Sequence, residues 1–280
     1  MAVRITPLTS SGFAAEAAGA ELTGAIGDDL AAALRGAARD HPVLVVRTSG
    51  LTPAQLLALA GVFGEPQVQL LEDYRASDTP AISVITSDQT DARGDGRRIV
   101  FGGAWHTDDS YLAVPAKATM LYADVIPPTG GDTLFADTTA AFEALDATTQ
   151  DEVGAMRAVH TYQSRRSLNV VPTRSATETA QTPPVDHPLV RTDPATGRRS
   201  LYLNPNRMES IVGLDDDASD AVLDRLIDHA TQDRFLFRHV WQRHDVVLWD
   251  NGRSMHRATA DYGDERREML RILLKGSVPV

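Results

Sequence analysis

The sequence predicts a mainly β protein, a β-sandwich or jelly roll with helices packed against its outside. Short apolar runs rich in β-branched residues recur along the chain, turn residues separate them, and helical segments lie early in the chain and between the strands. Neither an internal repeat nor a linker divides the 280 residues. We therefore expect one domain over 1–280, a usual size for a single all-β domain.

Four segments have the features of helices. An alanine-rich stretch that begins with two acids predicts a helix at 28–39, and a threonine–proline pair predicts the N-cap and first turn of a helix over 52–63. Apolar residues at helical spacing predict a helix at 138–157, and the last helix is expected at 215–233.

The remaining regular elements are strands and turns. Runs of four to eight apolar and β-branched residues, bounded by Gly, Pro or polar residues, are typical of buried strands. The polar stretch 88–98 is predicted to be a loop, and 127–131 a turn. The predicted strands cover residues 43–46, 81–87, 119–126, 133–135, 245–249 and 269–275.

Between Gln163 and His187 the composition changes to Ser, Thr, Arg, Pro and Ala, and no periodicity is visible. A structureless stretch of this length inside a compact domain is usually functional or disordered. We interpret 163–187 as a mobile lid, with an idle surface insertion as the alternative. Arg165 and Arg166 either gate an anionic substrate or keep the loop solvated.

Composition excludes several classes of function. The net charge of −11 disfavours binding to nucleic acids and to anionic membranes. The chain has no cysteine, so a metal would have to be held by His, Asp or Glu. The first residues lack a continuous apolar signal region, and no apolar run is long enough to span a bilayer. We therefore expect a soluble cytoplasmic protein.

The most informative motif is Trp105-His106-Thr107-Asp108. In a strand, His106 and Asp108 would point to the same face, because alternate side chains do so. Asp109 would point to the opposite face, and we expect it to be solvated or structural. An imidazole and a carboxylate together form two thirds of the facial triad that holds non-heme Fe(II) and leaves coordination positions open. His256, which follows an Asp-Asn-Gly turn, is the candidate for the second histidine.

Two arginines in the last predicted strand indicate an anionic ligand. Positions 267, 269, 271 and 273 share one face of that strand, so Arg267 and Arg271 would lie beside apolar residues. Burying guanidinium groups is unfavourable unless an anion meets them, and arginine binds carboxylates bidentately. The pair therefore favours internal acids or an anionic ligand such as a dicarboxylate.

These motifs, in this order, resemble the taurine dioxygenase family of Fe(II)- and 2-oxoglutarate-dependent oxygenases over most of the chain. The residues that carry the resemblance are Trp105-His106-Thr107-Asp108, Thr129-Gly130-Gly131-Asp132-Thr133-Leu134, His187-Pro188-Leu189-Val190-Arg191, Thr196-Gly197-Arg198, Leu248-Trp249-Asp250-Asn251, His256, Arg267 and Arg271.

The resemblance implies a double-stranded β-helix, a cupin-like jelly roll with iron between its two sheets. It implies that His106, Asp108 and His256 are the iron ligands and that Thr133 and Arg267 hold the distal carboxylate of 2-oxoglutarate. Fe(II), 2-oxoglutarate and O2 would together oxidise a substrate C–H bond, with release of succinate and CO2. A carboxylate at position 108 favours hydroxylation over halogenation, since the related halogenases have a small residue there.

Substrate residues are implied less directly. Arg271 matches the position that meets the anionic head of taurine in the taurine enzyme. Gln67 or Gln69 stands where that enzyme has a substrate-binding histidine, and Gly102-Gly103-Ala104 where it has an asparagine. We therefore expect a bulkier, anionic small molecule other than taurine.

Further substrate contacts are expected around Pro205, where Asn204, Asn206 and Arg207 either line the pocket or serve an ordinary turn.

Two other functions stay open at this point: a redox-neutral hydrolase or isomerase on the same barrel using Zn or Mn, and a binding module without activity. The sequence does not identify the substrate. It also does not distinguish hydroxylation from desaturation, cyclisation or cleavage. A homo-oligomer, such as a dimer, is expected only from the resemblance.

Overall fold

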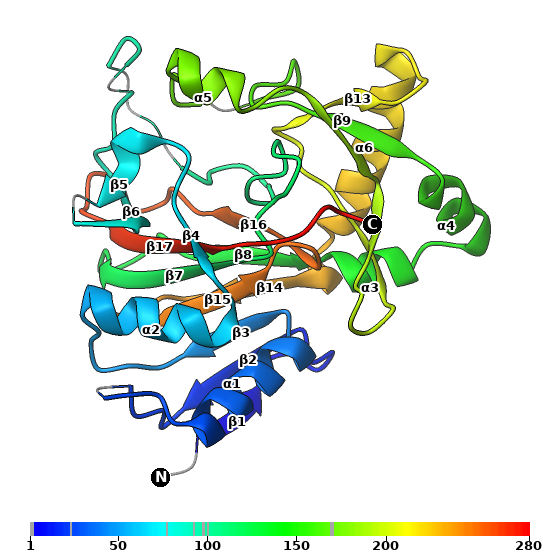
Figure 1. The fold of residues 1–280 in the computed structure, drawn as a ribbon. Coiled ribbons are helices and arrows are strands. Elements are labelled where there is room, and N and C mark those ends of the chain that lie inside the picture. Colours follow the sequence, from blue (N-terminus) through cyan, green and yellow to red (C-terminus); the bar gives the residue numbers. More distant parts are fainter. Residues whose placement is uncertain are drawn as a thin grey trace.

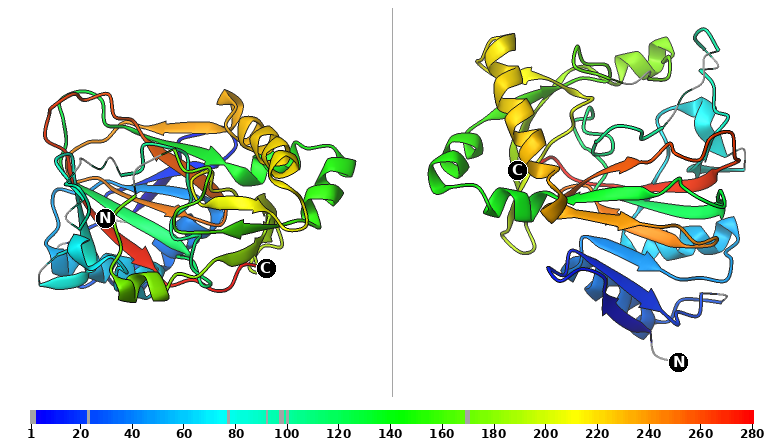
Figure 2. Two further views of the ribbon diagram at one scale, coloured as in Figure 1. Left: turned by 90° about the horizontal axis from the view of Figure 1, so that it is seen from above. Right: turned by 180° about the vertical axis from the view of Figure 1, so that it is seen from behind.

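A computed structural model of the chain describes residues 3–22, 24–76, 78–91, 93–96, 99, 101–168 and 171–280. Two mainly antiparallel sheets face each other, with helices on the outside of both, and a third group of strands and helices lies above them (Figures 1 and 2). This arrangement confirms the predicted jelly roll. Within the described residues, no helix is both long and apolar enough to cross a membrane.

The large sheet carries most of the predicted strands. Among the described residues it has nine strands, and its central pairs are antiparallel, with Leu248 opposite both Leu44 and Met120. In spatial order its path is β1 (Arg4–Pro7), β2 (Ala14–Ala18), β3 (Val43–Val46), β15 (Val246–Asp250), β7 (Ala118–Val125), β17 (Glu268–Leu274), β6 (Thr79–Thr86) and β5 (Arg75–Ala76), while β4 (Pro66–Gln67) pairs with β17.

The second sheet is small and faces the large one. It has the order β14 (Leu236–His239), β8 (Thr133–Asp137) and β16 (Ser254–Ala258). Two further groups of strands lie beyond it: β10 (Val185–Pro188), β9 (Arg157–His160) and β13 (Met208–Ile211), and the pair β11 (Val190–Thr192) and β12 (Arg199–Leu201).

The helices cover the outer faces of the sheets. α1 (Asp28–Asp40) and α2 (Pro53–Phe63) pack on the large sheet through an apolar cluster that includes Leu34 and Leu59. The short helix η1 (Glu72–Tyr74) follows α2. α3 (Thr138–Glu143), α4 (Ala147–Gly154), α6 (Asp216–Ala230) and η2 (Asp233–Phe235) cover the small sheet side, and α5 (Ala176–Ala180) lies above the sheets (Figure 1).

The core between the two sheets is apolar and positions the site. Val45, Leu121 and Met269 of the large sheet meet Phe135 of the small one, and Trp249 packs edge-on against Phe135 with ring centroids 5.4 Å apart. Burial of such residues from both inner faces drives the association of the sheets. The inter-sheet space therefore holds a rigid wall on which polar side chains can be fixed.

The helix predicted at 138–157 is wrong in one respect. α3 ends at Glu143, and α4 begins after Asp146, whose side chain accepts a hydrogen bond from the backbone N–H of Thr149 at 3.0 Å. Asp146 is therefore an N-cap, and it starts a second helix instead of continuing the first. Strand β9 already begins at Arg157.

The segment predicted to lack structure at 163–187 is also different. It contains α5, which a capping box between Ser175 and Glu178 starts, and it reaches into β10. Residues 169 and 170 of this segment, and 92, 97 and 98 of the predicted loop 88–98, lie outside the described residues.

Candidate active site

A cavity of about 140 Å³ is lined by residues of both sheets. A space of this size accommodates a small molecule rather than a polymer chain. Its polar lining is concentrated on residues that the sequence had singled out. These are Gln69, His106, Asp108, Thr133, Asn206, Arg207, His256, Arg267 and Arg271.

Three of these residues converge on one point. One donor atom from each of His106, Asp108 and His256 lies within 4.8 Å of the others. The Nε2 atoms of His106 and His256 lie 3.8 and 3.6 Å from the two carboxylate oxygens of Asp108. Two imidazoles and one carboxylate in this arrangement fit a divalent iron with open coordination positions.

The backbone explains why the histidines meet. His106 and His256 form an isolated antiparallel bridge, each donating its N–H to the other's carbonyl at 3.0 and 2.9 Å. Their rings therefore lie side by side, with centroids 4.0 Å apart. Nδ1 of His106 lies 2.9 Å from the carbonyl of Ala104, which turns Nε2 toward Asp108.

A chain of buried hydrogen bonds orients Asp108. Thr119 donates to its Oδ2 at 2.6 Å, Asn251 donates to Thr119 at 2.9 Å, and Trp249 donates to Asn251 at 3.1 Å. Such supporting contacts fix the rotamer of a metal ligand. Sequence reasoning missed Thr119. Its only signal was a hydroxyl at the start of a largely apolar strand.

The protonation states suit metal binding. Burial lowers the pKa of His106 and brings that of His256 to about 3, so both imidazoles are neutral at pH 7. Burial pushes the pKa of Asp108 upward, but the neighbouring His256 and Arg271 outweigh it and the pKa falls to about 2. Neutral imidazoles and an ionised carboxylate are the forms that ligate a metal.

Thr133 and Arg267 both line the cavity. Thr133 is 3% exposed, and its Oγ1 accepts a hydrogen bond from Trp241 at 3.0 Å, which leaves its own proton free to donate. Arg267 donates through Nε to the carbonyl of Gly131 at 3.2 Å, and burial lowers its pKa. A hydroxyl and a guanidinium therefore line the same cavity.

Gly131 makes this placement possible. Its φ is +71°, and a Cβ there would lie 3.2 Å from Cδ of Arg267. A side chain would be strained by the backbone and would crowd the arginine.

Arg271 and Asp109 form the charged floor of the cavity. Nη1 of Arg271 lies 3.5 Å from Oδ1 of Asp108. The sequence predicted that Asp109 would point away from the site and be solvated or structural, which is wrong. Residues 108–110 form a turn in which Asp109 has a φ of +55° and lines the cavity. Burial raises its pKa to about 6, against the charge of Arg271.

The remaining predicted substrate residues separate into two groups. Gln69 is buried and lines the cavity, as does Arg207, whereas Gln67 donates to Asp109 at 3.0 Å. Asn204 is 1% exposed and donates to the carbonyl of Thr107 at 2.6 Å, so it supports the metal-site turn from behind. The expectation that Asn204 lines the substrate pocket is therefore not met.

An aromatic wall closes the cavity opposite the small sheet. Tyr111 and Tyr162 stand edge to face with centroids 5.1 Å apart, and Phe101 packs edge-on against Tyr74 at 5.2 Å. Sequence reasoning did not identify either Tyr111 or Tyr162. Their positions beside the metal motif and at the start of the predicted lid were the available signals.

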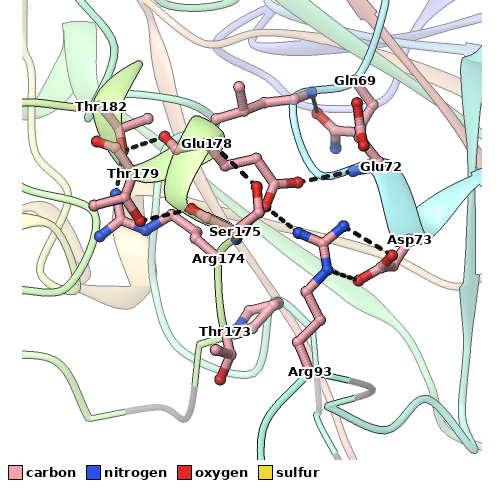
Figure 3. Close-up of polar contacts among 12 residues, drawn as sticks. Gln69, Glu72, Asp73, Arg93, Thr173, Arg174, Ser175, Glu178, Thr179 and Thr182 are labelled. Carbon is pink, nitrogen blue, oxygen red and sulfur yellow. Dashed lines mark hydrogen bonds and ion pairs between the residues drawn. The ribbon is translucent and has the colours of Figure 1, made fainter.

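The wall is tied to the segment that contains α5 (Figure 3). Glu178 accepts from Arg93 at 2.5 Å and from the backbone N–H of Glu72 at 3.0 Å, while Arg93 also pairs with Asp73 at 2.6 Å. Tyr162 donates to the carbonyl of Pro172 at 2.8 Å. Three segments far apart in the sequence are thus joined around the cavity.

Arg165 and Arg166 do not reach the cavity lining. Arg165 pairs with Asp220 of α6 at 2.7 Å, and Arg166 pairs with Asp220 and Asp224. Both arginines anchor the start of the 163–187 segment to α6, and neither gates the substrate in this structure.

A jelly roll that holds two histidines and one carboxylate beside a buried arginine defines the class of non-heme iron oxygenases. The sequence model of the "Taurine catabolism dioxygenase TauD, TfdA family" matches residues 4–273. The chain therefore belongs to this family and is a dioxygenase, which confirms the resemblance that the motifs suggested.

Characterised relatives are similar over most of the chain. The alpha-ketoglutarate-dependent 2,4-dichlorophenoxyacetate dioxygenase of Cupriavidus pinatubonensis is 34% identical over 241 residues, which cover 83% of this chain and 84% of that protein. The (S)-phenoxypropionate/alpha-ketoglutarate-dioxygenase of Delftia acidovorans is 33% identical over 270 residues, covering 91% and 89%. The crystal structure of AAD-2 with Mn(II) and N-oxalylglycine superposes with a TM-score of 0.84 at 29% identity, covering 100% of this chain and 99% of that one.

Proposed function

We propose that this dioxygenase hydroxylates a C–H bond of a small anionic organic molecule other than taurine. The enzyme uses Fe(II), 2-oxoglutarate and O2. One observation carries the proposal: the cavity holds the triad and Arg267, and two more guanidinium groups, those of Arg207 and Arg271, also line it. Among the described residues, the carboxylate that pairs with Arg271 is that of Asp108, which is also a candidate metal ligand.

The residues are assigned as follows. His106, Asp108 and His256 would hold the iron, because their donor atoms lie within 4.8 Å of one another. Thr133 and Arg267 would bind the distal carboxylate of 2-oxoglutarate. Gln69, Arg207 and Arg271 are the candidates for substrate contact, and Asn204 positions the turn that carries Asp108.

The chain itself contributes binding, orientation and exclusion of water. When bound, the iron with its co-substrates supplies the oxidising power: 2-oxoglutarate is decarboxylated to succinate and CO2, and one oxygen atom of O2 enters the substrate C–H bond. Thr119 keeps the Asp108 carboxylate in one orientation, and Arg267 fixes the far end of the co-substrate. The aromatic wall of Tyr111 and Tyr162 excludes solvent from the reacting end.

Relatives support an anion that carries an apolar body. The proteins from Cupriavidus and Delftia are named for 2,4-dichlorophenoxyacetate and (S)-phenoxypropionate, which both join a carboxylate to an aromatic ring. The cavity here offers both kinds of surface, guanidinium groups and aromatic side chains. Gly102, whose absent Cβ would lie 3.3 Å from Cε1 of His106, leaves room beside the triad.

We further propose that the chain is one domain in which the segment 163–187 acts as a lid. Val171 and Pro172 of this segment line the cavity, and Glu178 holds it to Arg93. We also propose that the enzyme works in the cytoplasm, where 2-oxoglutarate is a central metabolite, and that it forms homo-oligomers. Light scattering after gel filtration tests the last point.

The proposal is tested in two stages. Without oxygen, Fe(II) and 2-oxoglutarate should together produce a visible absorption band with the wild type and none with His106→Ala. With oxygen, succinate formation is measured with 2,4-dichlorophenoxyacetate, (S)-phenoxypropionate, hexyl sulfate and taurine. We expect stimulation by at least one of the first three. Stimulation by taurine alone would contradict the proposed substrate class.

A further inference from the structure

The three arginines of the cavity differ in their partners. Nη1 of Arg271 lies 3.5 Å from Oδ1 of Asp108. Arg267 donates to the carbonyl of Gly131 and lies at the co-substrate end. Arg207 has no ion pair with any carboxylate in the part of the chain that the structure describes, although it lines the same cavity.

Arg207 is held in place by its surroundings. Its backbone N–H donates to Asn204 at 2.9 Å, and its carbonyl accepts from Thr161 at 2.7 Å. The guanidinium carbon lies 4.7 Å from the ring centre of Tyr162 and 5.1 Å from that of Tyr111. The cation therefore packs beside two aromatic rings that contact each other, on a backbone that is fixed by hydrogen bonds.

This packing leaves the charge incompletely satisfied. Nη1 of Arg207 is buried and has no hydrogen-bond partner among the described residues; Nε of Arg271 lacks one as well, but Arg271 has an ion pair with Asp108. Contact with an aromatic face offsets only part of the desolvation of a cation. A buried guanidinium is fully stabilised when an anion accepts its hydrogen bonds.

The residues around Arg207 are apolar, with Leu71, Phe101 and Val171 packed beside the two tyrosines.

We propose that Arg207, which packs against Tyr111 and Tyr162, is the residue that binds the anionic group of the substrate, and that Arg271 instead balances the charge of Asp108. The inference rests on the proposed function and deepens it. The substrate class that fits is a carboxylate or sulfate ester joined to an apolar or aromatic body, which would lie against Leu71, Phe101 and Val171.

The test separates charge recognition from packing. Protein loaded with Mn(II) and N-oxalylglycine is titrated calorimetrically with 2,4-dichlorophenoxyacetate and its neutral amide, and with hexyl sulfate and hexyl methyl sulfone. The wild type should bind at least one anion more tightly than its neutral analogue. Arg207→Gln should weaken that anion roughly tenfold to a hundredfold, the usual range for a lost charged hydrogen bond, and leave the neutral analogue unchanged.

Two further variants complete the design. Arg207→Lys keeps the charge without the planar stacking and should recover part of the affinity, whereas Arg271→Gln should retain the preference for the anion. The proposal is overturned if the wild type prefers neither anion, or if Arg271→Gln and not Arg207→Gln removes the preference. Failure of N-oxalylglycine to bind with Mn(II) would instead contradict the proposed function.

Discussion

Replacing Asp109 by asparagine should change how the stability of the metal-free protein depends on pH. The carboxyl of Asp109 is 8% exposed and accepts hydrogen bonds from Gln67 at 3.0 Å and Tyr111 at 3.2 Å. Burial, opposed by Arg271 and reinforced by Asp108, raises its pKa from 3.8 to about 6. The folded protein therefore keeps this proton at pH values where the unfolded chain has lost it.

The sign and size of the effect follow from this difference. Because the pKa is higher in the folded state, the stabilising contribution is complete below pH 3.8 and is lost as the pH rises through about 6. The shift corresponds to about 3 kcal/mol of unfolding free energy, and roughly 2 kcal/mol of it falls between about pH 4.5 and 7.5. Asparagine has no proton to lose, so Asp109→Asn should gain this amount relative to the wild type over that interval.

Urea unfolding in the presence of a chelator measures the effect at several pH values. The control is Asp228→Asn, which removes an exposed carboxylate from α6 and should leave the wild-type pH profile unchanged. A constant offset between Asp109→Asn and the wild type would report only on altered hydrogen bonds to Gln67 and Tyr111. Parallel profiles would therefore refute the reasoning that Asp109 is a buried, destabilising charge at neutral pH.

Three further changes test other parts of the structure. Arg267→Ala should raise the 2-oxoglutarate concentration that is needed for turnover without weakening Mn(II) binding, and unchanged affinity for N-oxalylglycine would contradict its assigned role. Thr119→Val should lower Mn(II) affinity by roughly 10–100-fold by freeing Asp108, whereas Thr119→Ser should restore it; calorimetry distinguishes the two. Glu178→Gln should destabilise the protein by about 1–3 kcal/mol and speed proteolysis within 163–187, because it breaks a buried charged hydrogen bond to Arg93. Glu143→Gln, which breaks the exposed pair with Arg198, is its control and should change the unfolding free energy by at most about 1 kcal/mol.

The metal ligands could be predicted from the sequence, although their side chains converge for a different structural reason than the one expected. The argument from the sequence placed His106 and Asp108 on one face of a strand. In the structure, His106 forms only an isolated bridge with His256, and Asp108 lies in a turn. The two side chains still converge, because the turn brings Asp108 back toward the His106 ring. Residue type and order were enough to identify the site, although local periodicity was not.

Local signals that were present in the sequence explain two of the errors. Asp146 is followed three residues later by a backbone N–H that it caps, so a second helix start could have been recognised inside 138–157. Ser175 and Glu178 form a serine–x–x–glutamate capping box, which identifies a helix inside the segment that was expected to lack structure. In both segments the prediction did not take the helix-capping residues into account.

Asn204 and Asp109 were misplaced for a different reason, because their roles depend on long-range contacts. Asn204 reaches Thr107, nearly a hundred positions earlier in the chain, and Asp109 reaches Gln67. Neither contact has a sequence signature. Only the folded chain shows that the asparagine lies behind the turn while the aspartate enters the cavity.

The difference between local signals and long-range contacts also explains why the sequence predicts the cofactor chemistry but not the substrate. Iron requires particular donor groups, so residue types at a few positions carry most of the information. In the proposal made above, substrate recognition depends on which of two arginines has a carboxylate within reach, and the structure gives one only to Arg271 among the described residues. Under this proposal, two family members with identical metal ligands can bind their substrate anions through different arginines. A change at position 207 should alter substrate choice while leaving the use of 2-oxoglutarate intact.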